Sequence, residues 1–237
     1  MTDSAPPGPL AVYTFADEDL FSDLTAEQRA RIDRAISYAD YPPNKIFYAP
    51  EERGERLYIL RRGRVRIYKL SPEGRALTLL ILEPDSIFGE MALTAEWVHD
   101  SFAETMSEST VGAIRRDEMR RVLGAYPPVA LRFMNIMSQR LRALEHKLTD
   151  IAFKSVPQRL ATVLLNLADR QDAPAGRGAP AVVRYTHQQL AEMIGSYRET
   201  VTKAIGELRE AGLIRVDEDV IFLTDLERLR ELMAGKT

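Results

Sequence analysis

Polar side chains that could contact nucleic acid gather in one short stretch near the C-terminus, residues 186–205. An arginine can form a bidentate pair with guanine, and a carboxylate can accept a hydrogen bond from cytosine. Hydroxyl, amide and phenol groups suit phosphate oxygens, which position a protein on DNA without reading its sequence. The candidate base-reading residues are Arg198, Glu199 and Lys203, and the candidate phosphate contacts are Thr186, Gln188, Tyr197 and Thr200.

The apolar residues of the same stretch predict two short helices joined by a turn at Gly195. This arrangement is a helix-turn-helix, whose second helix presents its exposed N-terminal half to base edges. Apolar runs at 213–216 and 220–223 resemble the two strands of a wing. Taken alone, the stretch also fits an ordinary helical hairpin with a solvated charged face. The residues expected to bury the two helices are Leu190, Ala191, Ile194, Val201 and Ile205.

A long helix upstream carries apolar residues at alternating spacings of four and three. This heptad pattern is typical of a helix that packs against a symmetry mate. Two-fold symmetry would place two recognition helices about one DNA turn apart, ~34 Å. The alternative is a long helix packed on its own domain. The expected dimer seam consists of Met134, Met137, Leu141, Leu144, Leu148 and Ile151.

Short β-rich runs separated by glycine or proline occupy residues 41–114 and predict antiparallel strands. A small barrel or roll fits them, because no crossover of helical length separates the strands. The whole chain is therefore expected to be α+β, with an antiparallel β-roll, a long dimerisation helix and a winged helix-turn-helix. The predicted parts are a flexible tail at 1–20, a sensor-type β-roll domain at 21–124, the dimerisation helix at 125–153 and the DNA-binding domain at 154–237.

Composition narrows the remaining classes of function. Cysteine is absent, which excludes disulfides, thiol nucleophiles and thiolate-bound metals. The net charge of −3 means that DNA contact must come from a local basic surface. No apolar run is long enough to span a bilayer and no signal peptide is evident, so a cytoplasmic protein without membrane contact is expected. His99, His146 and His187 are scattered over different predicted elements, which argues against a metal site and a cupin-like enzyme.

Three motifs resemble the cAMP receptor protein and fumarate–nitrate regulator family, and the resemblance extends from about Phe21 almost to the C-terminus. Residues 87–93 are similar to its phosphate-cassette entry, 158–168 to its hinge-side helix and 197–201 to its recognition helix. The resemblance implies a homodimeric transcription regulator, an activator that works with RNA polymerase. It also implies that Arg198, Glu199 and Lys203 read a TGTGA-like half-site of a palindrome in double-stranded DNA.

The resemblance is incomplete where the family binds cAMP. The family uses a glutamate for the ribose, an arginine for the cyclic phosphate and polar side chains on the dimer helix. Glu90 matches the glutamate, but Asp100 occupies the arginine position, and Leu144 and Glu145 replace the polar pair. A carboxylate at Asp100 would repel the phosphate, so the chain resembles the cAMP-independent branch and is expected to require no cofactor.

A small-molecule effector other than cAMP stays open, with Gly89, Glu90 and Ser101 as the candidate pocket residues. Alternatively Gly89 and Glu90 are structural, serving a turn and backbone hydrogen bonds. Three other functions remain as alternatives: a regulator of the same family that does depend on cAMP or another ligand, a cupin-like enzyme, and a regulatory module that acts only through protein partners. The helix-turn-helix argues against the last of these.

Overall fold

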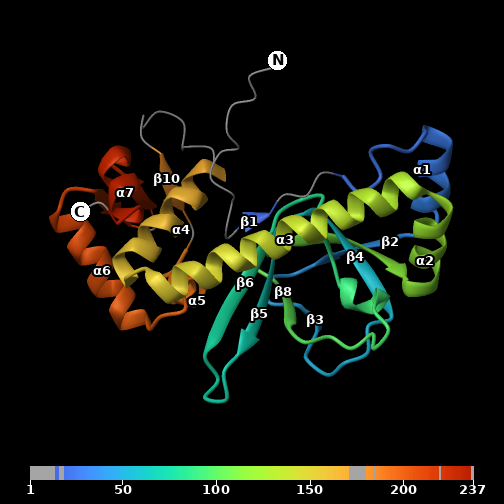
Figure 1. Cartoon of the computed structure of the whole chain (residues 1–237), viewed down its shortest axis with the longest axis horizontal. Helices are drawn as coiled ribbons and strands as arrows, with labels where there is room; N and C mark the ends of the chain where they lie inside the picture. The colour runs from blue at the N-terminus through green and yellow to red at the C-terminus, as the bar shows by residue number, and fades with distance from the viewer. Residues whose placement is uncertain (1–13, 16–18, 171–179, 184, 219, 236–237) are drawn as a thin grey trace. The chain divides into compact units, whose positions relative to one another are not determined.

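The computed structural model describes residues 14–15, 19–170, 180–183, 185–218 and 220–235. Its contacts divide the chain into two compact units, one containing residues 14–140 and the other residues 141–237. The expected α+β fold, with an antiparallel β domain, a long helix and a helix-turn-helix, is confirmed (Figure 1). Most of the tail predicted at 1–20 lies outside the described residues. Within it, β1 (Thr14–Phe15) pairs in parallel with a strand of the β domain.

Two sheets form the β-roll of the first unit. One has the strand order β1-β6-β5-β8-β3 and the other β2-β9-β4-β7, and all pairings except β1 with β6 are antiparallel. The remaining strands are β2 (Ser37–Tyr41), β3 (Ile46–Tyr48), β4 (Arg56–Arg62), β5 (Val65–Leu70), β6 (Ala76–Leu82), β7 (Ile87–Phe88), β8 (Phe102–Thr105) and β9 (Ser109–Arg115).

Strand β5 shows how the alternation in the sequence becomes a core. Val65 and Ile67 are buried and Arg66 lies half-buried between them, as the period of two predicts. A register shift between Ile67 and Tyr68 then lets Tyr68 point inward as well, because an irregularity of this kind resets the side-chain alternation.

The helices of this unit cover the core at one end of the roll. Helix α1 (Ala26–Asp33) starts with a capping box in which Thr25 and Gln28 each satisfy the other's backbone N–H. The short 3₁₀ helix η1 (Glu90–Leu93), α2 (Arg116–Ala125) and the start of α3 (Pro127–Phe153) follow. Leu20, Phe21 and Ile32 join the buried cluster of the β-roll, together with Met119 and Ile136.

The second unit packs helices on a small sheet. Helix α4 (Val156–Arg170) is buried through Leu160, Val163, Leu164 and Leu167. The sheet has the antiparallel order β10-β12-β11, with β10 (Ala181–Val183), β11 (Ile214–Asp217) and β12 (Val220–Leu223). It includes the two strands of the expected wing. Helices α5 (His187–Ile194), α6 (Arg198–Glu210) and α7 (Leu226–Met233) complete the unit.

Candidate nucleic-acid interface

Helix α5 is fixed at both ends. Thr186 caps its N-terminus by accepting from the backbone N–H of Gln189, and the Gln189 side chain accepts from the N–H of Thr186. At the other end, the buried side chain of Arg159 on α4 donates to the backbone oxygen of Ile194. Thr186 was predicted as a phosphate contact; the structure shows that its hydroxyl oxygen already serves the cap, which leaves the hydroxyl hydrogen for a further partner.

Gly195 makes the turn between α5 and α6. Its φ of 64° and ψ of 48° lie in the left-handed region, and its N–H donates to the oxygen of Ala191. A side chain at this position is strained because its Cβ crowds the following carbonyl oxygen. The glycine therefore sets the direction in which α6 leaves the turn.

Exchanging two glycines for alanine should have opposite effects on stability. Gly195→Ala is expected to lower the free energy of unfolding by about 1 kcal/mol, because alanine is strained at positive φ. Gly206→Ala is the matched control inside α6, where a Cβ meets no atom within 4 Å. It should raise stability by about 0.5–1 kcal/mol, because alanine restricts the unfolded chain and favours helix. Urea unfolding measures both; the same sign for the two variants would contradict this reading of the turn.

Helix α6 presents the base-reading candidates on an exposed surface. Val201, Ala204, Ile205 and Leu208 are buried, so the helix is held by one apolar face. All three predicted base readers are exposed, and so are Tyr197 and Thr200. The Lys203 ammonium lies 3.7 Å from a Glu207 carboxylate oxygen in an exposed pair, which is too weak to keep the lysine from DNA.

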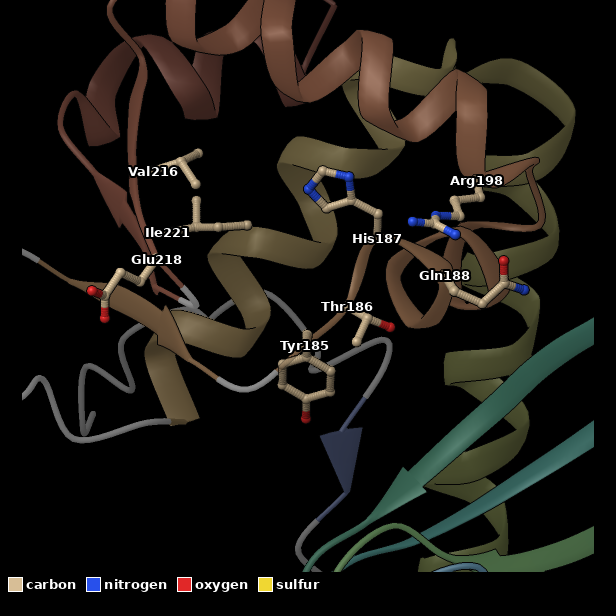
Figure 2. Close-up of a pocket in the computed structure, with 8 residues that line it drawn as sticks. All are labelled: Tyr185, Thr186, His187, Gln188, Arg198, Val216, Glu218 and Ile221. Carbon is tan, nitrogen blue, oxygen red and sulfur yellow. The ribbon is translucent and has the colours of Figure 1, made fainter.

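A pocket of about 470 Å³ lies where α5, α6 and the wing strands meet (Figure 2). It brings Arg198 together with two of the predicted phosphate contacts, Thr186 and Gln188. It does not include Glu199 or Lys203. The full lining is Tyr185, Thr186, His187, Gln188, Arg198, Val216, Glu218 and Ile221.

His187 has a role at this site that the sequence analysis did not assign. Its Nδ1 lies 2.9 Å from the Thr202 hydroxyl, which itself donates to the backbone oxygen of Arg198. The first residue of α5 is thereby connected to the first turn of α6. The available signal was the position of this histidine directly after an N-cap threonine. The sequence analysis considered His187 only as a possible metal ligand.

The expected seam residues lie along α3 and differ in exposure. Met134, Leu141 and Leu148, one heptad apart, are 62%, 59% and 69% exposed, and Ile151 is 38% exposed. Met137 and Leu144 are half-buried, and Met137 packs against the β-roll core. Large apolar side chains that repeat every seven residues and stay in solvent indicate an interaction surface.

The effector-pocket candidates of the β-roll differ in their surroundings. Gly89 has a φ of 79°, and a Cβ there would lie 3.0 Å from the Arg56 backbone oxygen, which supports a structural role for this glycine. The Glu90 carboxylate lies 3.7 Å from the guanidinium of Arg140. Ser101 is buried, whereas its neighbour Asp100 is exposed and pairs with Lys69 at 3.0 Å.

His99 is buried beside this site and stacks on Tyr48, with ring centroids 3.7 Å apart and planes within 6°. Burial lowers the pKa of His99 below its usual value of 6.5, although the charges of Glu90, Glu52 and Asp100 act in the opposite direction. The sequence analysis considered His99 only as a possible metal ligand.

This lowered pKa makes the β-roll sensitive to acid. In the unfolded chain His99 takes up a proton near pH 6.5, and in the folded chain it does so only at lower pH. Stability should therefore fall as the pH drops below 6.5, because the unfolded state binds more protons. Thermal unfolding of His99→Gln should show a shallower dependence on pH in this range than the wild type. An unchanged slope would contradict the assignment.

Comparison with known proteins decides the family. Residues 158–232 match the Crp-like helix-turn-helix domain, and residues 39–126 match the cyclic nucleotide-binding domain. A CRP-like cAMP-activated global transcriptional regulator from Mycobacterium tuberculosis is 30% identical over 210 residues, which cover 89% of this chain and 94% of the relative. The chain belongs to the CRP/FNR family of transcription regulators.

Further members support this assignment. Transcriptional regulator SdrP from Thermus thermophilus is 33% identical over 182 residues, covering 77% of this chain and 86% of SdrP. A solved CRP/FNR-family regulator from Thermus thermophilus superposes with a TM-score of 0.73 at 30% identity, covering 85% of this chain and all of the other. The protein is thus a DNA-binding transcription regulator and not an enzyme, which removes the cupin-like alternative.

Two further features, a membrane-spanning helix and a metal site, can be assessed in the described part of the chain. This part contains no helix long and apolar enough to cross a membrane. In the same residues, no three histidine or acidic side chains come together as possible metal ligands.

Proposed function

We propose that this CRP/FNR regulator binds a TGTGA-like palindrome as a homodimer and activates transcription with RNA polymerase without requiring cAMP. Arg198, Glu199 and Lys203 read bases, and the phosphate contacts position them. The protein acts in the cytoplasm. The tail expected at 1–20 does not include β1 or the buried Leu20, which belong to the β-roll. In this proposal residues 21–124 are the sensor-type domain, 125–153 the dimerisation helix and 154–237 the DNA-binding domain.

The exposed heptad positions of α3 support the homodimer. Met134, Leu141 and Leu148 would each leave water on pairing with the same residues of a second copy, since a two-fold interface is self-complementary. Each large apolar side chain buried in this way contributes about 1.5–3 kcal/mol. Their repeat of seven matches the period at which two helices meet.

The position of Asp100 is the observation that supports cAMP independence most strongly. By the resemblance, its carboxylate occupies the position of the family's arginine for the cyclic phosphate, and it lies exposed at the surface, 3.0 Å from the Lys69 ammonium. Glu90, the one matching residue, already has a cationic partner in Arg140. A cyclic nucleotide would therefore meet an aspartate where the family has an arginine. Its ribose would also compete with Arg140 for the Glu90 carboxylate.

A cAMP-dependent or otherwise ligand-dependent regulator is the second candidate. The Mycobacterium tuberculosis relative is described as cAMP-activated, and the β-roll matches the cyclic nucleotide-binding domain. Gly89, Glu90 and Ser101 would line the pocket in that case. The two candidates differ in one measurable property, the effect of cAMP on DNA affinity.

Fluorescence anisotropy at fixed salt separates them. A duplex with a TGTGA-like palindrome should bind about a thousandfold or more tightly than a scrambled duplex. Saturating cAMP should change neither affinity, and Glu90→Gln should bind DNA as the wild type does. Palindrome binding that needs cAMP and is lost in Glu90→Gln would establish the second candidate. Transcription from a promoter carrying the palindrome, with purified RNA polymerase, tests activation.

A further inference from the structure

A second pocket lies in the β-roll unit, outside the residues assigned above to DNA, dimerisation or an effector. It has a volume of about 230 Å³. The end of β9, the start of α2, the start of β4 and the loop after η1 form its wall. We call it the arginine pocket, and its lining residues are Glu55, Arg56, Trp97, Arg115, Arg116 and Asp117.

Three arginines and two carboxylates, Glu55 and Asp117, line the arginine pocket and leave it a net positive charge. Arg56 and Arg115 stand directly opposite each other on β4 and β9, and like charges in facing positions are destabilising. Among the described residues, no ion pair forms on the guanidinium of Arg56, Arg115 or Arg116. The Nε of Arg116 is buried without a hydrogen-bond partner. An anion in the pocket would relieve both the repulsion and the unsatisfied donor.

The aromatic ring of Trp97 holds part of this charge in place. The Arg116 guanidinium lies 4.3 Å from the ring centroid, and that of Arg53 lies 5.1 Å from it. Stacking on an indole ring fixes the plane of a guanidinium and thereby orients its donors. Trp97 is anchored in turn through its backbone oxygen, which accepts from the N–H of Gly54 at 2.6 Å.

The N-terminus of α2 opens at the same place. Arg115 is its N-cap residue and provides no side-chain cap, while the N–H of Arg116 donates to the backbone oxygen of Glu55. The first turn of a helix carries unsatisfied N–H groups and a partial positive charge that favour phosphate. The guanidinium groups and the helix end therefore attract an anion together, against the repulsion of Asp117 in the same first turn.

We propose that the arginine pocket binds a small phosphate-bearing anion. Planar guanidinium groups match phosphate oxygens in bidentate geometry, and several arginines suit its double charge better than a single carboxylate. The pocket is small enough to favour a phosphate or a short phosphate ester over an extended chain. Inorganic phosphates and the phosphate esters of metabolites share this chemistry.

Trp97 is the single tryptophan of the chain, so its fluorescence reports on this pocket alone. Full-length protein is titrated with inorganic pyrophosphate and with ribose 5-phosphate at constant ionic strength, and with ribose and chloride as controls. A saturable change in emission with either phosphate, absent in both controls, is expected. The two phosphate arms show whether the ligand is an inorganic phosphate or an ester.

Arg115→Gln is the informative variant because Arg115 does not stack on Trp97 and leaves its emission intact. Losing one charge-assisted contact should weaken phosphate binding about tenfold or more. Arg121→Gln is the matched control on α2, since Arg121 is exposed, pairs with Glu118 and lies outside the pocket. The phosphate affinity of the Arg121→Gln variant should equal that of the wild type. Without phosphate, Arg115→Gln should melt no lower than the wild type, because the variant removes one of two facing like charges.

Several outcomes would overturn the proposal. The first is the absence of a saturable response to both phosphates, confirmed by isothermal titration. The second is equal weakening by Arg115→Gln and Arg121→Gln. The third is a response to polyglutamate but to neither phosphate, which would make the pocket a docking point for an acidic protein segment.

Discussion

Leu148→Glu is expected to convert the protein to a monomer and to weaken its binding to a palindromic duplex by about a hundredfold or more. Leu148 is 69% exposed in the single chain, so a carboxylate there costs little when the chain folds alone. In a dimer the same carboxylate would be buried without a partner against its symmetry mate, which is strongly unfavourable. The affinity falls because the two half-sites are then bound independently.

Gln139→Glu is the matched control for this substitution. It adds the same charge to the same helix at an exposed position that lies two residues from the seam residue Leu141, on another face. Light scattering should show a dimer for Gln139→Glu and a monomer for Leu148→Glu, with circular dichroism confirming that both fold. A monomeric Leu148→Glu that still binds the palindrome as tightly as the wild type would disprove the role assigned to the seam.

Arg198→Ala should cost about 1–3 kcal/mol of specific binding and relax the preference at one base pair of each half-site. The side chain lies at the first position of α6 and is exposed in the pocket shared with Gln188 and Thr186. A bidentate pair with guanine is lost in this variant, whereas phosphate contacts remain. Binding to random duplex should therefore change much less than binding to the palindrome.

Arg209→Ala removes the same side chain from the last turn of α6, at the end of the helix away from the pocket. It should leave base preference unchanged. Anisotropy titrations against duplexes with single base changes, at two salt concentrations, compare the variants. Equal losses of Arg198→Ala on specific and random DNA would show that this arginine contacts only phosphate.

The helix-turn-helix was predictable because its signals are local. Buried residues at helical spacing and a glycine at the turn are sufficient, and the structure confirms burial of Leu190, Ile194, Val201 and Ile205 with Gly195 at positive φ. The antiparallel roll was predictable for a similar reason, since strands joined by short turns leave few pairings open.

Other features depend on contacts between distant residues and could not be predicted. The pairing of Glu90 with Arg140 joins η1 to a helix fifty residues later. Strand β1 pairs with β6 through backbone hydrogen-bonding groups. Every sequence has these groups, so the sequence carries no signal for this pairing. Helix α7 has a clear local signal in its Asp225 cap, but its eight residues were not separated from the end of the wing.

The arginine pocket shows the same limit. Its charges come from β4, β9, the start of α2 and the loop before β4, and the facing positions of Arg56 and Arg115 follow only from the register of β4 with β9. From the sequence alone, these arginines cannot be distinguished from arginines on an ordinary solvent-exposed surface.

The contact between His187 and Thr202 determines which nitrogen of the imidazole ring the DNA would meet. The single hydroxyl proton of Thr202 is given to the Arg198 oxygen, so the hydroxyl must accept from His187, and Nδ1 carries the ring proton. A ring that donates from Nδ1 presents the lone pair of Nε2 to anything that enters the pocket. A phosphate oxygen would be repelled there, whereas a water molecule or a base amino group could donate to Nε2, so this tautomer selects its contact by polarity.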